Sequence, residues 1–304
     1  MKPNQLNTKK PSKLFDFMQY KYLFFIISLI MIIPGVFSLI KWGLKPSIDF
    51  KGGSVLEIQI NGSHTQQELE DDINSQIDSP QIIRMGEEDR YSIRTPEITN
   101  EKKQELLSFL NEKYSEVEEI RFSSLGPSLG RELLVKTLTG VAIAALAILL
   151  FISLRFKEKV FGISAIIAMF HDSLILLGVF SLLGHFYNIE VDALFVTAIL
   201  TILSFSVHDT VVVYDRIREL RRNHPSISFN KIANVAIIQT LERSINNSMT
   251  IIFVLLSLFL LGGQSIKYFS LALLIGTIVG TYSSTFTAVP LLVWWKEIQK
   301  RLAS

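Results

Sequence analysis

The sequence predicts an α-helical polytopic membrane protein with six transmembrane helices and one small α+β domain outside the membrane. Of its 304 residues, 49% are hydrophobic and only 19% are charged. The apolar residues are concentrated in six runs of about 20 residues, the length that crosses the apolar core of a bilayer as a helix. One long polar segment separates the first run from the second, so it is long enough to fold as a domain of its own.

The apolar runs set the boundaries of the predicted parts. They are Leu23–Trp42, Leu133–Leu154, Val160–Leu183, Ala193–Tyr214, Ser244–Gly263 and Tyr268–Trp295. The predicted organisation is a tail at 1–22, a first span at 23–42, an outer domain at 43–130, spans two to six within 131–295, and a tail at 296–304. An amphipathic connection at about 215–243 joins the fourth span to the fifth.

The distribution of basic residues predicts the orientation in the membrane. The net charge is only +2, but Lys and Arg collect in the first tail, in the second-to-third and fourth-to-fifth connections, and in the last tail. The short connections at 185–192 and 264–267 contribute only Lys267. By the positive-inside rule, both termini are predicted to be cytoplasmic, and segment 43–130 to lie outside the cell membrane.

The outer segment is predicted to be a ferredoxin-like domain of order β-α-β-β-α-β. "SVLEIQI" from Ser54 alternates as a half-buried strand does, and Thr65 with Glu68 has the spacing of a capping box at a helix start. "QIIRMG" and "RYSIRT" flank the polar "EED" as in a hairpin, Asn100 is predicted to cap a second helix, and "EVEEIRFSSLG" alternates again.

The segment offers no grouping of residues that points to catalysis. It holds one histidine, His64, and no Ser/His/Asp arrangement at usable spacing, and the whole chain has no cysteine. We therefore expect neither an enzyme nor a bound cofactor or metal, and no nucleic-acid partner.

Charged residues inside the spans are the strongest functional signal. A charged side chain at the centre of a span costs roughly 2.5–3.5 kcal/mol on insertion scales, and such residues are usually functional. Asp209 lies inside the fourth span, and Arg243 enters the fifth span from the same side of the membrane. We expect the two to pair, which relieves part of the burial cost. A static pair that only fixes packing is the alternative.

Polar stripes accompany both residues. Thr197, Thr201, Ser204 and His208 share one face of the fourth span, and Arg243, Asn247, Thr250 and Ser257 share one face of the fifth. These faces are expected to meet other helices or a wet cavity instead of lipid. His208 is a weaker candidate for proton transfer, because a neutral hydrogen-bonding role suits it equally.

Two further features lie in the third and sixth spans. His171 and Asp172 form a second polar island near the middle of the third span, where they either relay protons or bond to neighbouring helices. The sixth span carries small residues every four positions, which predicts close helix packing: Gly276, Gly280, Ser284 and Ala288.

Several stretches resemble the SecF family, the smaller membrane subunit of the SecD–SecF complex of bacterial protein export. The matching stretches are "DFKGG" (49–53), "LGPSLGREL" (125–133), "FHDSLILLG" (170–178), "HDTVVVYDRIRE" (208–219), "LERSINNSMTI" (241–251) and "GTYSS" (280–284). They occur in the family's order and cover nearly the whole chain.

The resemblance implies a proton-driven partner of the Sec translocon, built on the resistance–nodulation–division (RND) plan. SecD would supply a pseudo-symmetric half, the outer domains would engage unfolded preprotein, and the SecYEG translocon, YajC and YidC would be further partners. Protons would be the coupling ion. The family's proton-relay carboxylate and arginine fall on Asp209 and Arg243, with His208 where the family often has Asn. The location implied is the bacterial inner membrane.

Two other classes of function stay open. A half-sized RND-type exporter of small molecules would be expected to have larger outer domains with a binding pocket. A membrane-anchored adaptor would use the Asp209–Arg243 pair for packing alone. Proton dependence distinguishes the adaptor from the other two, and the identity of the substrate distinguishes those two from each other.

Overall fold

The computed structural model describes residues 16–61, 65–85, 89–114, 116–156 and 158–302. The chain divides into two compact units. The bundle unit comprises Met1–Leu44, Ala144–Ile189 and Thr197–Ser304, and the sheet unit comprises Lys45–Ile143 and Glu190–Val196. Most of the predicted tail at 1–22, like His64, lies outside the described residues.

Among the described residues, six helical segments are long and apolar enough to cross a membrane, as predicted. The first is the short helix η2 (Phe17–Tyr20) followed by α1 (Lys21–Lys41). The next four are α5 (Pro127–Arg155), α6 (Lys159–Tyr187), α7 (Ala193–Asn223) and α8 (Phe229–Leu261). The sixth combines α9 (Gln264–Ser283), the π-helical turn η3 (Ser284–Ala288) and α10 (Val289–Leu302).

The connection expected at about 215–243 is mostly a continuation of the two helices it joins. Residues up to Asn223 belong to α7 and residues from Phe229 onward belong to α8, so only 224–228 connect them. Arg216 Nε of α7 donates a hydrogen bond of 2.7 Å to Gln239 Oε1 of α8. The amphipathic pattern of the sequence therefore describes the polar ends of two long helices.

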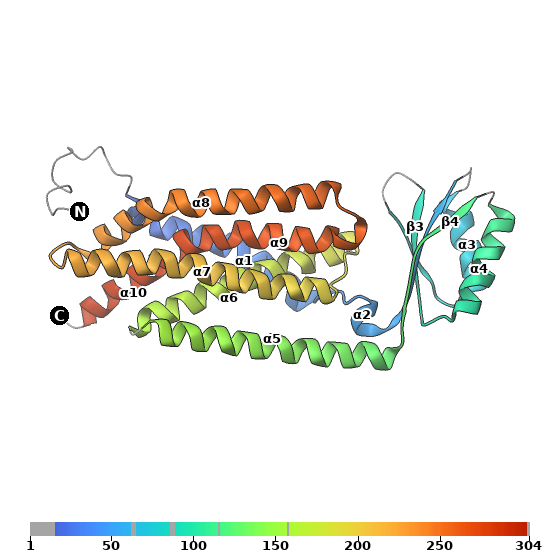
Figure 1. Cartoon of the computed structure of the whole chain (residues 1–304), viewed down its shortest axis with the longest axis horizontal. Helices are drawn as coiled ribbons and strands as arrows, with labels where there is room; N and C mark the ends of the chain where they lie inside the picture. The colour runs from blue at the N-terminus through green and yellow to red at the C-terminus, as the bar shows by residue number, and fades with distance from the viewer. Residues whose placement is uncertain (1–15, 62–64, 86–88, 115, 157, 303–304) are drawn as a thin grey trace. The chain divides into compact units, whose positions relative to one another are not determined.

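The sheet unit contains the short helix α2 (Ile48–Lys51) and a four-stranded antiparallel sheet with two helices on one face (Figure 1). Along the chain the elements are β1 (Gly53–Ile60), α3 (Gln66–Gln76), β2 (Gln81–Arg84), β3 (Arg90–Thr95), α4 (Asn100–Lys113) and β4 (Val117–Leu125). The strand order is β2-β3-β1-β4, so β1 pairs with both β3 and β4.

The core of the sheet unit follows the alternation of strand β1. Leu56, Ile58 and Ile60 are buried and pack with Leu69 of α3 and Leu110 of α4, because successive strand residues point to opposite faces of the sheet.

The two helices of the sheet unit begin at hydroxyl caps. Thr65 and Glu68 form the predicted capping box at the start of α3. The cap of α4 is Thr99, whose side chain accepts from the Lys102 backbone N–H, and the predicted cap Asn100 is the first residue of the helix. A threonine oxygen satisfies an otherwise unpaired N–H of the first turn as well as an asparagine does.

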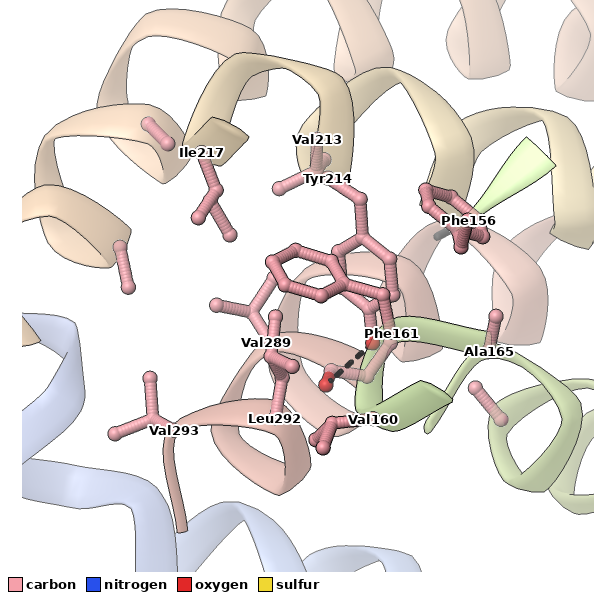
Figure 2. Packing of buried hydrophobic residues seen from close by; sticks show 14 of the residues in the cluster. Phe156, Val160, Phe161, Ala165, Val213, Tyr214, Ile217, Val289, Leu292 and Val293 are labelled. Carbon is pink, nitrogen blue, oxygen red and sulfur yellow. Dashed lines mark hydrogen bonds between the residues drawn. The ribbon is translucent and has the colours of Figure 1, made fainter. Parts of the chain in front are cut away.

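The bundle unit has an aromatic and aliphatic core where α6, α7 and α10 meet (Figure 2). Phe161 and Tyr214 pack edge to face with ring centroids 5.2 Å apart. The Tyr214 hydroxyl donates a hydrogen bond of 2.9 Å to the carbonyl of Ala288, the last residue of η3 (Figure 2). A π turn disturbs the regular backbone pairing of a helix, and here a side chain of α7 satisfies one of its carbonyls.

Helices α1 and α6 approach most closely at a pair of glycines. A Cβ added to Gly35 would lie 3.0 Å from Gly178 Cα, and one added to Gly178 would lie 2.9 Å from the Gly35 carbonyl carbon. One turn further along, Ser38 and Ser181 share a hydrogen bond of 2.7 Å. Small residues permit this approach because no side chain separates the two backbones.

The small-residue stripe of the sixth span packs inside the chain. A Cβ on Gly280 would meet Phe205 and Ser206 of α7 at 3.5 Å, and one on Gly276 would collide with Ile202. Gly276, Gly280, Ser284 and Ala288 are all buried. The close neighbour of this face is therefore α7 of the same chain.

We predict that Gly178→Ala destabilises the chain, whereas Gly140→Ala does not. The added methyl at 178 pushes two backbones apart, and overpacking of this kind costs about 1–3 kcal/mol. A Cβ on Gly140 of α5 meets nothing within 4 Å. Thermal unfolding of the purified chain in detergent measures the difference. Equal unfolding temperatures for the two variants would contradict the close approach.

Candidate functional site

Helix α7 carries Asp209 and begins in the sheet unit. Asp192 caps its start, since Asp192 Oδ1 accepts a hydrogen bond of 2.8 Å from the Phe195 backbone N–H. The Ala193 N–H donates to Asp49 Oδ2 at 3.1 Å, and Arg94 of β3 forms an ion pair of 2.9 Å with Glu190. Burial raises the pKa of the Glu190 carboxyl, and the charges of Arg94 and Lys45 act in the opposite direction.

Asp209 points into the protein. Its side chain is only 4% exposed, and its Oδ2 has no hydrogen-bond partner among the described residues. The neighbouring Thr210 is buried too, and its hydroxyl is equally without a partner there. A buried carboxylate without full hydrogen bonding is costly. The site thus holds an acidic group whose hydrogen-bonding capacity the described residues do not fully satisfy.

Arg243 does not contact Asp209 directly. No ion pair within 4.0 Å joins them among the described residues, although the charge of Arg243 acts on Asp209 through space. The residue beside the carboxylate is Ser244, which is buried, whereas Arg243 is exposed. Neighbouring helix residues differ by about 100° in direction, so α8 cannot turn both toward α7. The sequence prediction of a direct pair is therefore not met in this arrangement.

His208 lies on the exposed side of α7. It lines a hollow of about 390 Å³ between α5 and α7, together with Ala147 and Phe151. A second hollow of about 630 Å³ runs along Thr197, Thr201, Ser204 and His208, which is the predicted polar stripe. The stripe is uncovered in this chain, as is the stripe of α8: Arg243, Asn247, Thr250 and Ser257.

Three hydroxyls of the two stripes are satisfied within their own helices. Thr201 donates to the Thr197 carbonyl, Thr250 to that of Asn246 and Ser257 to that of Phe253, at 2.8–3.0 Å. Such back-bonding lets a hydroxyl face an apolar neighbour without a lost hydrogen bond. These faces therefore fit a covering helix as well as lipid.

The island in the third span is fully enclosed. Asp172 is 1% exposed and His171 is 5% exposed. Asp172 Oδ1 and His171 Nδ1 are 2.8 Å apart, and Asp172 Oδ2 accepts hydrogen bonds from Ser206 and Ser283 at 2.5 and 2.6 Å. The sequence left open whether these residues relay protons or bond to neighbouring helices. The structure shows bonds to the neighbouring helices α7 and α9. The described residues contain no group of three potential metal ligands.

Sequence reasoning missed the serines that surround the two carboxylates. Ser206, Ser244 and Ser283 are all buried. The available signal was spacing: Ser206 lies three residues before Asp209, and Ser244 follows Arg243. A small hydroxyl in an apolar span is common, so spacing alone does not separate a partner of a carboxylate from ordinary packing.

The chain resembles proteins of bacterial export over most of its length. The family model described as protein export membrane protein SecD/SecF, C-terminal, matches residues 105–298. The protein translocase subunit SecF of Thermobaculum terrenum is 41% identical over 298 residues, covering 93% of this chain and 94% of that protein. The SecF of Synechocystis is 33% identical, with coverage of 93% and 94%.

Fused relatives are longer. The protein translocase subunit SecDF of Bacillus subtilis is 32% identical over 95% of this chain, which covers 40% of that protein. The crystal structure of SecDF from Thermus thermophilus, a translocon-associated membrane protein, is 28% identical with a TM-score of 0.84, covering 94% of this chain. The chain spans 39% of that structure. By the family match and the identity to full-length relatives, this chain belongs to the SecF family of protein translocase subunits.

Proposed function

We propose that this chain uses proton movement through its helical bundle, together with a SecD partner, to promote translocation and release of preproteins. The observation that carries the proposal is the buried carboxylate of Asp209, which has one oxygen without a partner among the described residues and the charge of Arg243 nearby. A proton carrier needs a group whose two protonation states are close in free energy. Burial favours the neutral carboxyl and a nearby cation favours the ion, so a change in their separation switches proton affinity.

The available energy is sufficient for this role. Each proton that crosses the membrane delivers about 2.3 kcal/mol per 100 mV of potential. That amount biases a conformational equilibrium by roughly 50-fold, because ~1.4 kcal/mol corresponds to a factor of ten. Direct contact between Asp209 and Arg243 would belong to a second arrangement of α7 and α8, which alternates with the separated one.

SecD is the proposed partner of the uncovered polar faces. The fused relatives called SecDF are more than twice as long as this chain, which leaves room for a second half on the same polypeptide. The exposed stripes of α7 and α8 would meet that half. SecYEG, YajC and YidC are proposed further partners on the family resemblance alone.

The sheet unit is proposed to be a ferredoxin-like domain outside the inner membrane, where it engages unfolded preprotein. Its antiparallel order β2-β3-β1-β4 with α3 and α4 on one face fits that class. Both termini would be cytoplasmic, in keeping with the basic residues near the ends of the helices. Arg155, Arg218 and Arg221, for example, pair with acidic residues at one end of the bundle.

Single cysteines test this orientation, since the chain has none of its own. Asn74 and Ser226 are both exposed, in α3 and in the connection between α7 and α8. We expect Asn74→Cys to react with a membrane-impermeant maleimide on intact spheroplasts, and Ser226→Cys to react only after permeabilisation. External reaction of Ser226→Cys would contradict the orientation.

We predict that Asp209→Asn assembles normally but abolishes the proton-dependent stimulation of export. Asn keeps the shape and polarity of the side chain but does not ionise. The measurement is preprotein translocation into membrane vesicles with and without a proton gradient. The matched control is Asp215→Asn on the same helix, where the carboxylate pairs with Arg155 and Arg218. Full stimulation by assembled Asp209→Asn would show that the carboxylate is structural.

Replacements of Arg243 test whether its charge is what matters. Because Arg243 acts on Asp209 through space, Arg243→Lys is expected to keep a substantial part of the stimulation. Arg243→Met has similar bulk and no charge, and its loss of proton-dependent stimulation is expected to be at least tenfold greater than that of Arg243→Lys. The same vesicle assay compares the two variants at equal protein levels. Equal activity of Lys and Met variants would exclude an electrostatic role.

A further inference from the structure

The carboxylate of Asp172 joins three helices at one point. It belongs to α6, Ser206 belongs to α7 and Ser283 is the last residue of α9. Both hydroxyls bond to the same oxygen, Oδ2, while Oδ1 bonds to His171. With a side chain 1% exposed, Asp172 has no solvent to replace these partners. Removal of the carboxylate therefore breaks the polar connection among the three helices.

The bonds of Asp172 hold the part of α7 that contains Asp209. Ser206 precedes Asp209 by three residues, which places the two close to one another along one side of the helix. Beyond Asp209, the Tyr214 hydroxyl bonds to the Ala288 carbonyl. Segment 206–214 is thus tied at both ends, and the attachment points on the sixth span, Ser283 and Ala288, bracket the π turn η3.

A second branch of the network reaches α8. Thr281 of α9 and Ser248 of α8 share a hydrogen bond of 2.6 Å. Ser248 lies one turn after Ser244, the residue beside the Asp209 carboxylate. The helix that carries Asp209 and the helix that carries Arg243 are therefore both connected through α9. π turns are rare and frequently occur at functional sites, and this one begins directly after Ser283.

We propose that Asp172 is a positioning residue for the proton relay, which holds segment 206–214 against α6 and α9 and so keeps Asp209 buried. It acts through hydrogen bonds to Ser206 and Ser283, and it does not itself carry the proton. The proposal rests on the proposed role of Asp209. This role differs from general packing because it depends on two specific hydroxyl partners and controls the burial of Asp209.

The hydrogen bonds that Asp172 makes allow a positioning role to be distinguished from proton transfer. Serine hydroxyls both donate and accept, and an asparagine offers one acceptor and two donors. Asp172→Asn therefore retains hydrogen bonds to Ser206 and Ser283 without an ionisable group. Asp172→Ala removes all of them. A positioning residue tolerates the first change and not the second, whereas a proton carrier tolerates neither.

The first experiment measures the burial of position 209 without reference to transport. Asp209→Cys in the full chain, in native membranes, is treated with N-ethylmaleimide, a membrane-permeant reagent. We expect Asp172→Ala to raise the rate of reaction at least tenfold and Asp172→Asn to change it less than threefold. Ser226→Cys reports reagent activity in every sample. An unchanged rate in the Asp172→Ala background would overturn the proposal.

A milder pair of variants covers the case in which Asp172→Ala does not fold. Ser283→Ala removes one bond to Asp172, and we expect it to raise the reaction rate of Asp209→Cys about threefold or more. Ser270→Ala is the matched control, because Ser270 is buried in the same helix and its hydroxyl has no partner among the described residues. Equal reaction rates of Asp209→Cys in the Ser283→Ala and Ser270→Ala backgrounds would contradict the positioning role of Asp172.

The second experiment measures export in vesicles with Asp209 present. We expect Asp172→Asn to keep proton-dependent stimulation within threefold of the unmodified chain, with the same optimum pH. Asp172→Ala is expected to reduce this stimulation at least tenfold. Complete loss in Asp172→Asn, with normal burial of position 209, would assign proton transfer to Asp172 and overturn the positioning role. If Asp209→Asn itself remained active, the proposed function would fail, while the labelling result would still decide whether Asp172 controls burial at 209.

Discussion

The cost of a carboxylate buried among apolar helices is the constraint on which this bundle depends. Two buried aspartates differ in how far hydrogen bonds offset this cost. Asp172 is enclosed with partners on both oxygens, from α6, α7 and α9. Asp209 is buried, and one of its oxygens has no partner in the part of the chain that the structure describes. Hydrogen bonds from three helices to one buried carboxyl group satisfy its polar atoms, so the first aspartate stabilises an arrangement of helices. The second stays responsive to any change in its surroundings.

Helix α7 carries Asp209 and also provides Ser206, which bonds to Asp172. It begins in the sheet unit, where Asp192 caps it, Asp49 accepts from its first N–H and the preceding Glu190 pairs with Arg94 of the sheet. It then continues into the bundle unit as a single helix to Asn223. A continuous helix transmits axial displacement and rotation along its length. The start of the helix that presents Asp209 is held to the sheet unit by a hydrogen bond and an ion pair.

The sequence was sufficient for features that depend on length, alternation and local capping. Six apolar runs became six long helices because a helix is the only single-segment structure that satisfies its own backbone in lipid. The burial of Leu56, Ile58 and Ile60 followed from a period of two. The π turn at Ser284–Ala288 was not predictable from apolar runs or alternation; Asp172 bonds to Ser283 directly before it and Tyr214 to Ala288 at its end. The apolar run that ends at Tyr214 predicts a span, and it does not give the end of α7 at Asn223, because a helix can continue where its apolar residues end.

The site shows a sharper limit. Depth along a span can be read from sequence, and Asp209 and Arg243 were expected at the same depth. Rotation about the helix axis cannot be read in the same way, because a single step along the chain changes direction by about 100°. That step separates Ser244, which faces Asp209, from Arg243, which faces outward. The same sensitivity has a mechanistic consequence. In the proposed relay, a modest rotation of α8 or a change in the long side chain of Arg243 would alter the field at Asp209, while the hydrogen bond from Ser206 to Asp172 would keep α7 in place. Ser248 ties α8 to Thr281 of α9, so the side chain of Arg243, which is exposed, is the part of the proposed relay that can move with least disturbance of the bundle.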